Sequence, residues 1–346
     1  MTLTHRSPSQ RNRAARLRIT LAAIACLGLA AAGCGSAGGS ASSGGSKKPA
    51  GEAKVAYASS LDFLNQKDFF PAFTKATGYP TTDWVDSAGA LEAEIAGNEI
   101  APNVFESVGG DNITPLEPKF THWFIQYAST QMVLAYNPQS KYASQFKAIA
   151  SGKEPLKDLF ALMEKPGFKL GRTDPNIDPQ GRAFIFMLEL AQAYYHLPKD
   201  TVTKILGGPL ASSTSKEIYS ETSLDATLSS GQLDASSAYI TQAKELHLDY
   251  IALPPAINLG DFALATQYAK ASITITDDGV KATKTGSPLV IDITIIGKPT
   301  AASTAFVKYV LSPAGLAIYK QGGFTLFKPV VTGTGVPAAI SSELGG

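Results

Sequence analysis

QMVLAYNP, residues 131–138, contains five consecutive apolar side chains and ends in an Asn-Pro pair. A short apolar run of this kind predicts a strand that is buried on both faces. We predict that this strand leaves one half of the molecule and enters another. The return is expected at YIALPP, residues 250–255, where two prolines favour a stiff crossover. Two halves joined by two crossings predict a hinged cleft, a shape that suits ligand capture.

Strand-like and helical segments alternate on both sides of this run. Such alternation predicts parallel or mixed sheets wrapped by helices, with ligands at the carboxyl ends of the strands. Pro71 is expected to divide the first helical segment into two short helices. We expect strands at residues 53–58, 82–85, 103–107 and 288–296, and helical segments at residues 61–73, 90–96 and 300–319.

The predicted fold class is α/β with two lobes, each a mixed sheet flanked by helices, and a cleft between the lobes. The chain of 346 residues is long enough for two domains with real cores. We predict that lobe 1 comprises residues 52–134 and 255–346, and that lobe 2 comprises residues 135–254.

The N-terminal segment, residues 1–33, has the layout of a secretory signal peptide. Five arginines and no acidic residue precede an apolar run at residues 19–33, which is too short for an ordinary membrane span. Small residues directly before Cys34 resemble a bacterial lipobox. We therefore predict export, lipidation of Cys34 and anchoring to the outer face of the cytoplasmic membrane; ordinary cleavage with a free Cys34 is the alternative. Residues 34–51, rich in Gly, Ser and Ala, are expected to be a flexible tether.

Removal of the leader changes the sign of the net charge. The chain has 30 Lys plus Arg and 29 Asp plus Glu, and the five leader arginines taken from the 30 leave 25, a net charge of −4. A mildly acidic body argues against a nucleic-acid partner, which would need a basic surface. Cys26 would leave with the leader and Cys34 would carry the lipid, so no disulfide is expected.

GRTDPNIDPQGR, residues 171–182, is the segment with the most distinctive chemistry. It holds Arg172 and Arg182, the only arginines after the leader. Their guanidinium groups suit contact with an oxyanion, or with the nearby carboxylates of Asp174 and Asp178, and both alternatives stay open. Asp178 followed by proline predicts the start of a helix. The free N–H groups and the dipole at that helix start favour an anion.

Several stretches resemble one known family. They are SSL at residues 59–61, NVFESV at 103–108, DPNIDPQG at 174–181, YIALPPAI at 250–257 and TGSP at 285–288. In these stretches the chain resembles the periplasmic molybdate/tungstate-binding proteins of ABC importers, which have the type II two-lobe fold. The resemblance implies that Ser60 and Ser107 hydrogen-bond a tetrahedral oxyanion, that Asp178 approaches its metal centre, and that Tyr250 is the family's tyrosine near the crossover. It also implies delivery of the ligand to ABC permease subunits.

Two positions depart from the family pattern. The branch most like this chain has Glu where Gln232 stands, with the interval to Tyr250 preserved, and Ser87 directly precedes Ala88, where the family serine is expected. A carboxamide is a poorer ligand than a carboxylate for a high-valent metal, but it offers an N–H donor. We therefore expect an oxyanion held mainly by neutral donors. The predicted ligand-binding residues are Ser60, Ser87, Ser107, Asp178, Gln232 and Tyr250, with Arg172 and Arg182 as candidate anion contacts.

Each of these residues also has an ordinary structural explanation. Serines at strand ends are often helix caps, Tyr250 can be a core aromatic residue, and Gln232 can be an exposed loop residue. Only a joint arrangement around one cleft favours the binding function.

Rival functions have weaker support in the sequence. Another oxyanion such as sulfate, or another small solute, would suit the same fold. STSK at residues 213–216 and KTG at residues 284–286 match two elements of serine acylating enzymes, but the middle element is missing. A scaffold lipoprotein would present a large exposed apolar patch. We predict a monomeric binding protein with no enzyme activity, cofactor or free metal cation, which contacts the membrane only through its lipid.

Overall fold

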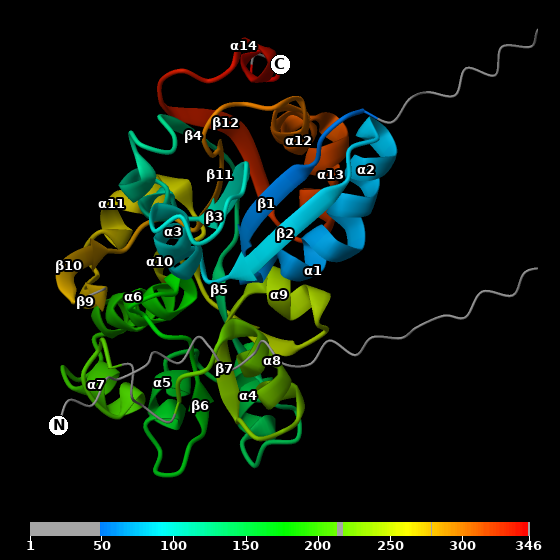
Figure 1. The fold of residues 1–346 in the computed structure, drawn as a ribbon. Coiled ribbons are helices and arrows are strands. Elements are labelled where there is room, and N and C mark those ends of the chain that lie inside the picture. Colours follow the sequence, from blue (N-terminus) through cyan, green and yellow to red (C-terminus); the bar gives the residue numbers. More distant parts are fainter. Residues whose placement is uncertain (1–48, 213–216, 278, 345–346) are drawn as a thin grey trace, which may run out of the picture. The chain divides into compact units, whose positions relative to one another are not determined.

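Two mixed sheets and one separate hairpin organise the part of the chain that the structure describes (Figure 1). The computed structural model describes residues 49–212, 217–277 and 279–344. The predicted signal peptide, Cys34, most of the tether and the STSK stretch at 213–216 lie outside the described residues.

The larger sheet has six strands in the order β12-β4-β11-β3-β1-β2. β1 pairs in parallel with β2 and β3, while β11 runs antiparallel to β3 and β4, and β12 runs antiparallel to β4. The inner strands β1, β3 and β11 are buried almost throughout, as expected for a sheet that is covered on both faces. The strands are β1 (Ala53–Ala58), β2 (Thr81–Asp86), β3 (Val104–Val108), β4 (Trp123–Ser129), β11 (Val290–Ile295) and β12 (Thr325–Gly333).

The smaller sheet has four strands in the order β6-β7-β5-β8. The predicted buried strand at 131–138 is confirmed as β5, which lies between β7 and β8 and runs antiparallel to both. β6 and β7 are parallel. The strands are β5 (Met132–Tyr136), β6 (Leu170–Gly171), β7 (Ala235–Tyr239) and β8 (Asp249–Ala252).

Helices pack against both sheets, which confirms the predicted α/β class. α3 and α12 contact β1 of the larger sheet, whereas α4, α6, α8 and α9 contact strands of the smaller one. The α-helices are α1 (Asp62–Leu64), α2 (Phe70–Thr77), α3 (Ala88–Ala96), α4 (Ala143–Ala150), α5 (Asp158–Met163), α6 (Pro179–Tyr194), α7 (Thr201–Leu206), α8 (Glu221–Ser229), α9 (Ile240–Glu245), α10 (Pro255–Asn258), α11 (Ala265–Tyr268), α12 (Ala301–Leu311), α13 (Pro313–Gln321) and α14 (Ala338–Ser341). Shorter 3₁₀ turns lie at Ser59–Leu61 (η2), Gly110–Asn112 (η4), Thr114–Leu116 (η5) and Phe262–Leu264 (η6), and a π-helical turn (η3) at Asn65–Phe69.

Two connections link the sheets, and they are hydrogen-bonded to each other. The first runs from β4 into β5 through Thr130 and Gln131, and the second runs from β8 into α10. Asn258 Nδ2 donates to Gln131 Oε1 at 3.0 Å, and the backbone N–H of Ile240 donates to Gln131 O at 2.9 Å. The predicted lobe boundary after Leu134 falls inside β5, because all five residues of that strand pair with β7. The division into lobes stays a prediction.

Some expected elements differ from the structure. The segment 300–319 forms two helices, α12 and α13, because Pro313 begins a new helix after the Ser312 cap. The first helical segment does contain two short α-helices, α1 and α2, but the π-helical turn η3 joins them, and Pro71 lies in the first turn of α2. β12 and the hairpin β9–β10 were not expected, although β9 alternates Ile273 and Ile275 with polar residues, as a half-buried strand does.

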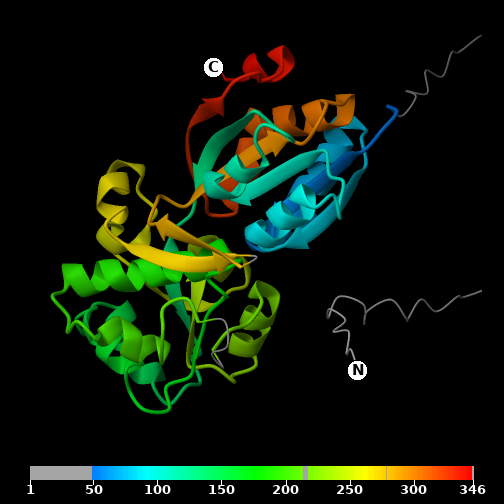
Figure 2. The ribbon, with the colours of Figure 1, turned by 60° about the vertical axis from the view of Figure 1, so that its left-hand side comes forward.

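The hairpin of β9 (Ser272–Asp277) and β10 (Val280–Thr285) lies along α6 (Figure 2). The backbone N–H of Thr276 donates to Asn176 Oδ1 at 2.9 Å, and that of Ser272 donates to Glu189 Oε2 at 2.8 Å. Lys284 Nζ lies 3.3 Å from Asp111 Oδ2, in η4. The hairpin therefore contacts elements that pack on both sheets.

Within the described ranges, no single helix has the length and apolar character needed to cross a membrane. α12 and α13 meet those criteria only as a pair, and they are bent by 61° at their junction.

Candidate functional site

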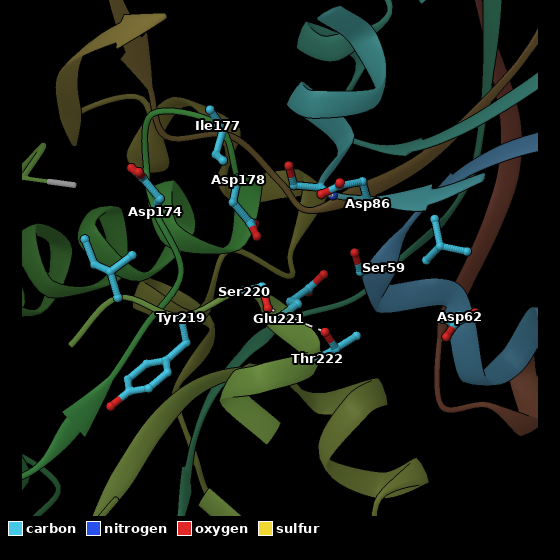
Figure 3. A pocket seen from close by; sticks show the side chains of 13 residues that line it. Ser59, Asp62, Asp86, Asp174, Ile177, Asp178, Tyr219, Ser220, Glu221 and Thr222 are labelled. Carbon is cyan, nitrogen blue, oxygen red and sulfur yellow. Dashed lines mark hydrogen bonds between the residues drawn. The ribbon is translucent and has the colours of Figure 1, made fainter. Parts of the chain in front are cut away.

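A cleft of about 600 Å³ opens between two groups of residues that are far apart in the sequence (Figure 3). We define the first wall as the lining residues next to β1 and β2, and the second wall as those near α6 and α8. The first wall consists of Ser59, Asp62, Val85, Asp86 and Ser87. The second wall consists of Asp174, Ile177, Asp178, Ile218, Tyr219, Ser220, Glu221 and Thr222.

Asp178 both caps α6 and faces the cleft. Its Oδ1 accepts the N–H of Gln180 at 2.8 Å, with Pro179 in the first turn, so the predicted helix start is confirmed. Burial raises the pKa of the Asp178 carboxyl to about 6, and the Gln180 N–H and the positive charge of Arg182 oppose this rise. The negative charge of Asp86 on the first wall raises this pKa further. The two walls therefore repel each other through these carboxylates when the cleft holds no compensating positive centre.

Glu221 is the first residue of α8 and the second buried carboxyl of the second wall. Figure 3 shows its side chain directed toward Ser59 on the first wall. Burial raises the pKa of Glu221 well above its ordinary value, and Asp178 and Asp225 add to the rise. Hydrogen bonds from Gln242 and Ser59 oppose it. Glu221 was not predicted from the sequence.

The first wall is built from the residues that follow β1 and β2. Asp86 ends β2, and its Oδ1 accepts the N–H of Ser87 at 2.6 Å. Ser87 is the N-cap of α3, where its hydroxyl accepts the N–H of Ala90 at 3.3 Å. Ser59 begins the 3₁₀ turn that follows β1. The carboxyl ends of two parallel strands thus bring these side chains to one edge of the sheet, as the alternation predicts.

Negative charge dominates the lining of the cleft. Five of the thirteen described lining residues are acidic, and none of the thirteen is Lys or Arg. These acidic side chains would repel a dianion that makes no other contact, because like charges at short range raise each other's energy. The lining suits a ligand with a positive centre that accepts carboxylate oxygens.

Tyr239 places an unpaired hydroxyl next to this cleft. It ends β7 and is 1% exposed, and its hydroxyl has no hydrogen-bond partner among the described residues. Burial raises its pKa well above the ordinary value, and the nearby charges of Glu221 and Asp178 raise it further. A buried hydroxyl without a partner costs free energy unless a ligand satisfies it.

Ser60 and Ser107 do not line this cleft, although Ser87 and Asp178 do. Ser60 lines a neighbouring hollow of about 350 Å³ that also contacts Asp225. Ser107 is fully buried; its hydroxyl donates to Gly109 O at 3.2 Å and accepts from Asn112 Nδ2 at 3.3 Å. Their roles as direct ligands stay predictions without support from this geometry.

Gln232 and Tyr250 also lie away from the cleft. Gln232 is exposed in the turn after α8, and its Nε2 donates to Ser230 Oγ at 3.0 Å. Tyr250 is half-buried in β8 and packs on a small apolar cluster of the smaller sheet. Glu221 lines the cleft and Tyr239 lies close to Glu221 and Asp178, and the two are separated by the same interval of sequence. The ligand-binding roles expected of Gln232 and Tyr250 therefore stay predictions without support from this geometry.

The two arginines make protein contacts instead of lining the cleft. Arg172 is fully buried, and its guanidinium donates to Ser212 O at 3.2 Å. Arg182 donates to Asn112 Oδ1 at 3.1 Å and lies 3.9 Å from Asp111 Oδ2. It thus joins α6 to η4, next to the larger sheet, and its charge reaches Asp178 only through space.

Comparison with known proteins places the chain in a family. A family model described as bacterial extracellular solute-binding protein matches residues 53–325. The chain belongs to this family. Its members are the solute-binding components of ABC transporters, so the family relationship that the sequence predicts is confirmed.

Two relatives and one solved structure show how far the similarity extends. An uncharacterized solute-binding protein of Petrotoga mobilis is 29% identical over 260 residues, which cover 72% of this chain and 77% of that protein. The molybdate/tungstate-binding protein WtpA of Pyrococcus abyssi is 30% identical over 240 residues, which cover 64% of this solute-binding protein and 67% of WtpA. The periplasmic molybdate-binding protein of Azotobacter vinelandii matches with a TM-score of 0.53 at 19% identity, covering 80% and 100% of the two chains. This last match supports the two-lobe fold alone.

Proposed function

We propose that this solute-binding protein captures molybdate or tungstate outside the cytoplasm and delivers it to an ABC permease. One observation carries the proposal: two buried carboxyls, Asp178 and Glu221, face one cleft from the starts of two helices. The family membership and the name of the relative in Pyrococcus abyssi support the same ligand class.

The chemistry of the metal decides between the candidate anions. Molybdenum and tungsten in their highest oxidation state accept more than four oxygen ligands, whereas the sulfur of sulfate remains four-coordinate. Asp178 and Glu221 supply hard carboxylate oxygens, which suit such a centre. Sulfate would meet the same acids only as repelling charges. The earlier expectation of mainly neutral donors rested on Gln232, which does not line the cleft.

The remaining donors would hold the oxygens of the anion. The hydroxyl of Tyr239 has no partner among the described residues, and Ser59 and Ser87 line the first wall. Ser87 already uses its oxygen as the cap acceptor of α3, so its hydroxyl hydrogen is the part that is open to an anion.

Closure of the cleft follows from charge. Asp86 on the first wall and Asp178 on the second repel each other, which favours separation of the walls in the empty protein. A bound metal centre offsets this repulsion and links the walls, so the ligand favours the closed form by its higher affinity for it. The paired connections at Gln131 and Asn258 are the expected hinge.

Calorimetric titration with molybdate, tungstate and sulfate tests this function. We expect molybdate and tungstate to bind at least ~tenfold more tightly than sulfate. Glu221→Gln should remove that preference, because the amide is a poor ligand for the metal. Gln232→Glu is the control: it adds a carboxyl in an exposed turn and should change neither affinity nor preference. Equal affinities for all three anions, or preference for sulfate, would contradict the proposal.

We propose further that the protein is held at the membrane by a lipid on Cys34, as the sequence predicts. Mass spectrometry of the mature N-terminus should find acylated Cys34, and Cys34→Ser should release the protein into the soluble fraction. An unmodified N-terminus at another residue would contradict this anchoring.

A further inference from the structure

A buried network of side-chain amides surrounds the carboxylate of Glu221. Gln180 Nε2 donates to Glu221 Oε1 at 2.9 Å, and Gln242 Nε2 donates to the same oxygen at 2.9 Å. The two glutamines are 1% and 5% exposed. Neither is one of the thirteen residues that line the cleft. Their contact with the ligand site therefore runs through Glu221.

A backbone group fixes the direction of both amides. The N–H of Tyr239 can only donate, and it donates to Gln242 Oε1 at 3.0 Å, so Gln242 turns its NH₂ group toward Glu221. Gln180 must then present its own NH₂ group to Gln242 Oε1, at 2.8 Å. The remaining oxygen of Gln180 accepts the hydroxyl of Ser237 at 3.0 Å. Each amide is thus locked in one orientation.

The two amides donate hydrogen bonds to only one of the two carboxylate oxygens of Glu221. Two N–H groups occupy Oε1, and a proton on that oxygen would face them. Neither amide donates to Oε2, and Figure 3 shows the Glu221 side chain directed toward Ser59, so we infer that Oε2 is the oxygen available to the cleft. Hydrogen bonds from N–H groups favour the ionised form of a carboxyl. With Oε1 held by two amides, the side chain of Glu221 is fixed in direction, and its ionised form would present one oxygen to a metal centre.

Other charged groups act on Glu221 in the opposite sense. Asp178 faces it from the start of α6, and Asp225 lies one turn further along α8; both raise its pKa after burial, the largest cause. Asp62 and Asp86 face the same cleft from the first wall, and the hydroxyl of Tyr239 is close by. The hydrogen bond from Gln242 opposes this rise, and the pKa of Glu221 still lies well above its ordinary value.

We propose that Gln180 and Gln242 are positioning residues that hold Glu221 through Oε1, so that Oε2 alone meets the bound oxyanion. This inference rests on the proposed function and deepens it. In this inference, the preference for an oxyanion with a metal centre depends on two amides that act through Glu221 and do not contact the ligand. Support of this kind around a coordinating carboxylate changes affinity by about 10- to 100-fold in metal sites.

Gln180→Met and Gln242→Met test the inference, because methionine keeps the length of the side chain and removes the amide. Two readouts apply to each variant: the pH midpoint of the Glu221 carboxyl by NMR without ligand, and molybdate affinity by calorimetry between pH 5 and pH 8. We expect a higher midpoint and about tenfold weaker molybdate binding. The pH below which binding is lost should also rise, and in a Glu221→Gln background neither change should add a further loss.

Gln267→Met is the matched control, because Gln267 also donates through Nε2, to Ala256 O at 2.7 Å, away from the cleft. It should leave both readouts unchanged. An unchanged Glu221 midpoint in either Gln180→Met or Gln242→Met would overturn the inference. One folded variant suffices, since each removes one of the two donors. A wild-type protein that binds no oxyanion would remove the proposed function, while the ligand-free titration would still decide whether the amides control Glu221.

Discussion

Gly89 lies so close to the backbone of Ile177 that a β-carbon on the glycine would stand 2.4 Å from the Ile177 carbonyl oxygen. Gly89 belongs to the first turn of α3, which packs on β1 and β2, and Ile177 belongs to the loop that leads to Asp178. The absence of a side chain on Gly89 therefore allows the two walls of the cleft to approach.

Gly89→Ala should weaken oxyanion binding, because the added methyl group pushes the 174–178 loop away from the first wall. We expect a loss of about tenfold or more in affinity, comparable to the cost of overpacking. Gly208→Ala is a suitable control, since a β-carbon there meets no atom within 4 Å. Calorimetry on both variants checks the effect, and unchanged affinity in Gly89→Ala would show that this contact does not govern binding.

Asp178→Asn should stabilise the ligand-free protein at neutral and higher pH. The folded-state pKa of Asp178, about 6, exceeds its ordinary value of 3.8, so the folded state binds the proton more tightly than the unfolded state does. Stability therefore falls as pH rises from about 4 to 6, and the full penalty applies above that range. Asparagine keeps the helix cap without the charge.

The expected gain in the free energy of unfolding for Asp178→Asn is on the order of 1–3 kcal/mol at pH 8, and little at pH 4. Urea denaturation at the two pH values measures it. Asp261→Asn is the control, because Asp261 is an exposed N-cap that accepts the N–H of Ala263 at 2.9 Å. A pH-independent change in Asp178→Asn would contradict the argument.

Tyr239→Phe should weaken ligand binding while leaving the empty protein at least as stable. The hydroxyl has no partner among the described residues, so its removal costs the empty protein no hydrogen bond. A hydrogen bond to a charged ligand contributes about 1.5–3 kcal/mol, so we expect roughly 10- to 100-fold lower affinity. Tyr250→Phe, in β8, should change neither quantity. Thermal unfolding and calorimetry together distinguish the outcomes, and equal affinities for the two variants would count against Tyr239.

The pH dependence of affinity should differ between anions. A carboxylate must be ionised to bind a metal, so molybdate affinity is expected to fall as pH drops through about 6, where Asp178 takes up a proton. Sulfate, which gains only from loss of negative charge in the cleft, should bind more tightly over the same range. Calorimetric titrations at pH 5, 6, 7 and 8 measure both trends. A parallel rise for molybdate and sulfate would show that the acids act as hydrogen-bond donors instead.

Ser59→Ala should reduce affinity more than Ser60→Ala. Ser59 lines both the cleft and the neighbouring hollow, whereas Ser60 lines only the hollow. Successive side chains of a 3₁₀ turn point about 120° apart, so only the first of the two adjacent serines reaches the cleft. We expect about a tenfold loss for Ser59→Ala and little change for Ser60→Ala. A larger loss of affinity for Ser60→Ala than for Ser59→Ala in calorimetry would instead identify Ser60 as the ligand contact, as the family resemblance implies.

The fold was largely predictable from the sequence, because its strong signals are local. The apolar run of β5 and the Asp-Pro start of α6 each depend on neighbouring residues, and both are confirmed. The break between α12 and α13 follows from Pro313, which the sequence also shows. The hairpin β9–β10 was missed although β9 alternates apolar and polar residues, while its place along α6 depends on contacts with Asn176 and Glu189, distant in the chain.

The cleft was only partly predictable. The same sequence interval separates Glu221 from Tyr239 and Gln232 from Tyr250. Spacing alone does not show that Glu221 is buried at the start of α8, while Gln232 lies in an exposed turn after that helix. Asp178 was found because its cap role has a local pattern. Gln180 and Gln242 could not be found, because their importance arises from a shared contact with Glu221, formed only when α6, α8 and α9 come together.

The hydrogen bond from Thr276 to Asn176 has a consequence for how affinity can change in evolution. Asn176 also donates to Asp174 Oδ1 at 2.8 Å, so the loop that carries Asp178 is braced by a hairpin far along the chain. Substitutions in that hairpin can shift the loop, and with it the proposed oxyanion preference, without altering any residue that lines the cleft. Substitutions in the β9–β10 hairpin are thus a way in which evolution can adjust the affinity of this protein to a scarcer or more abundant ligand.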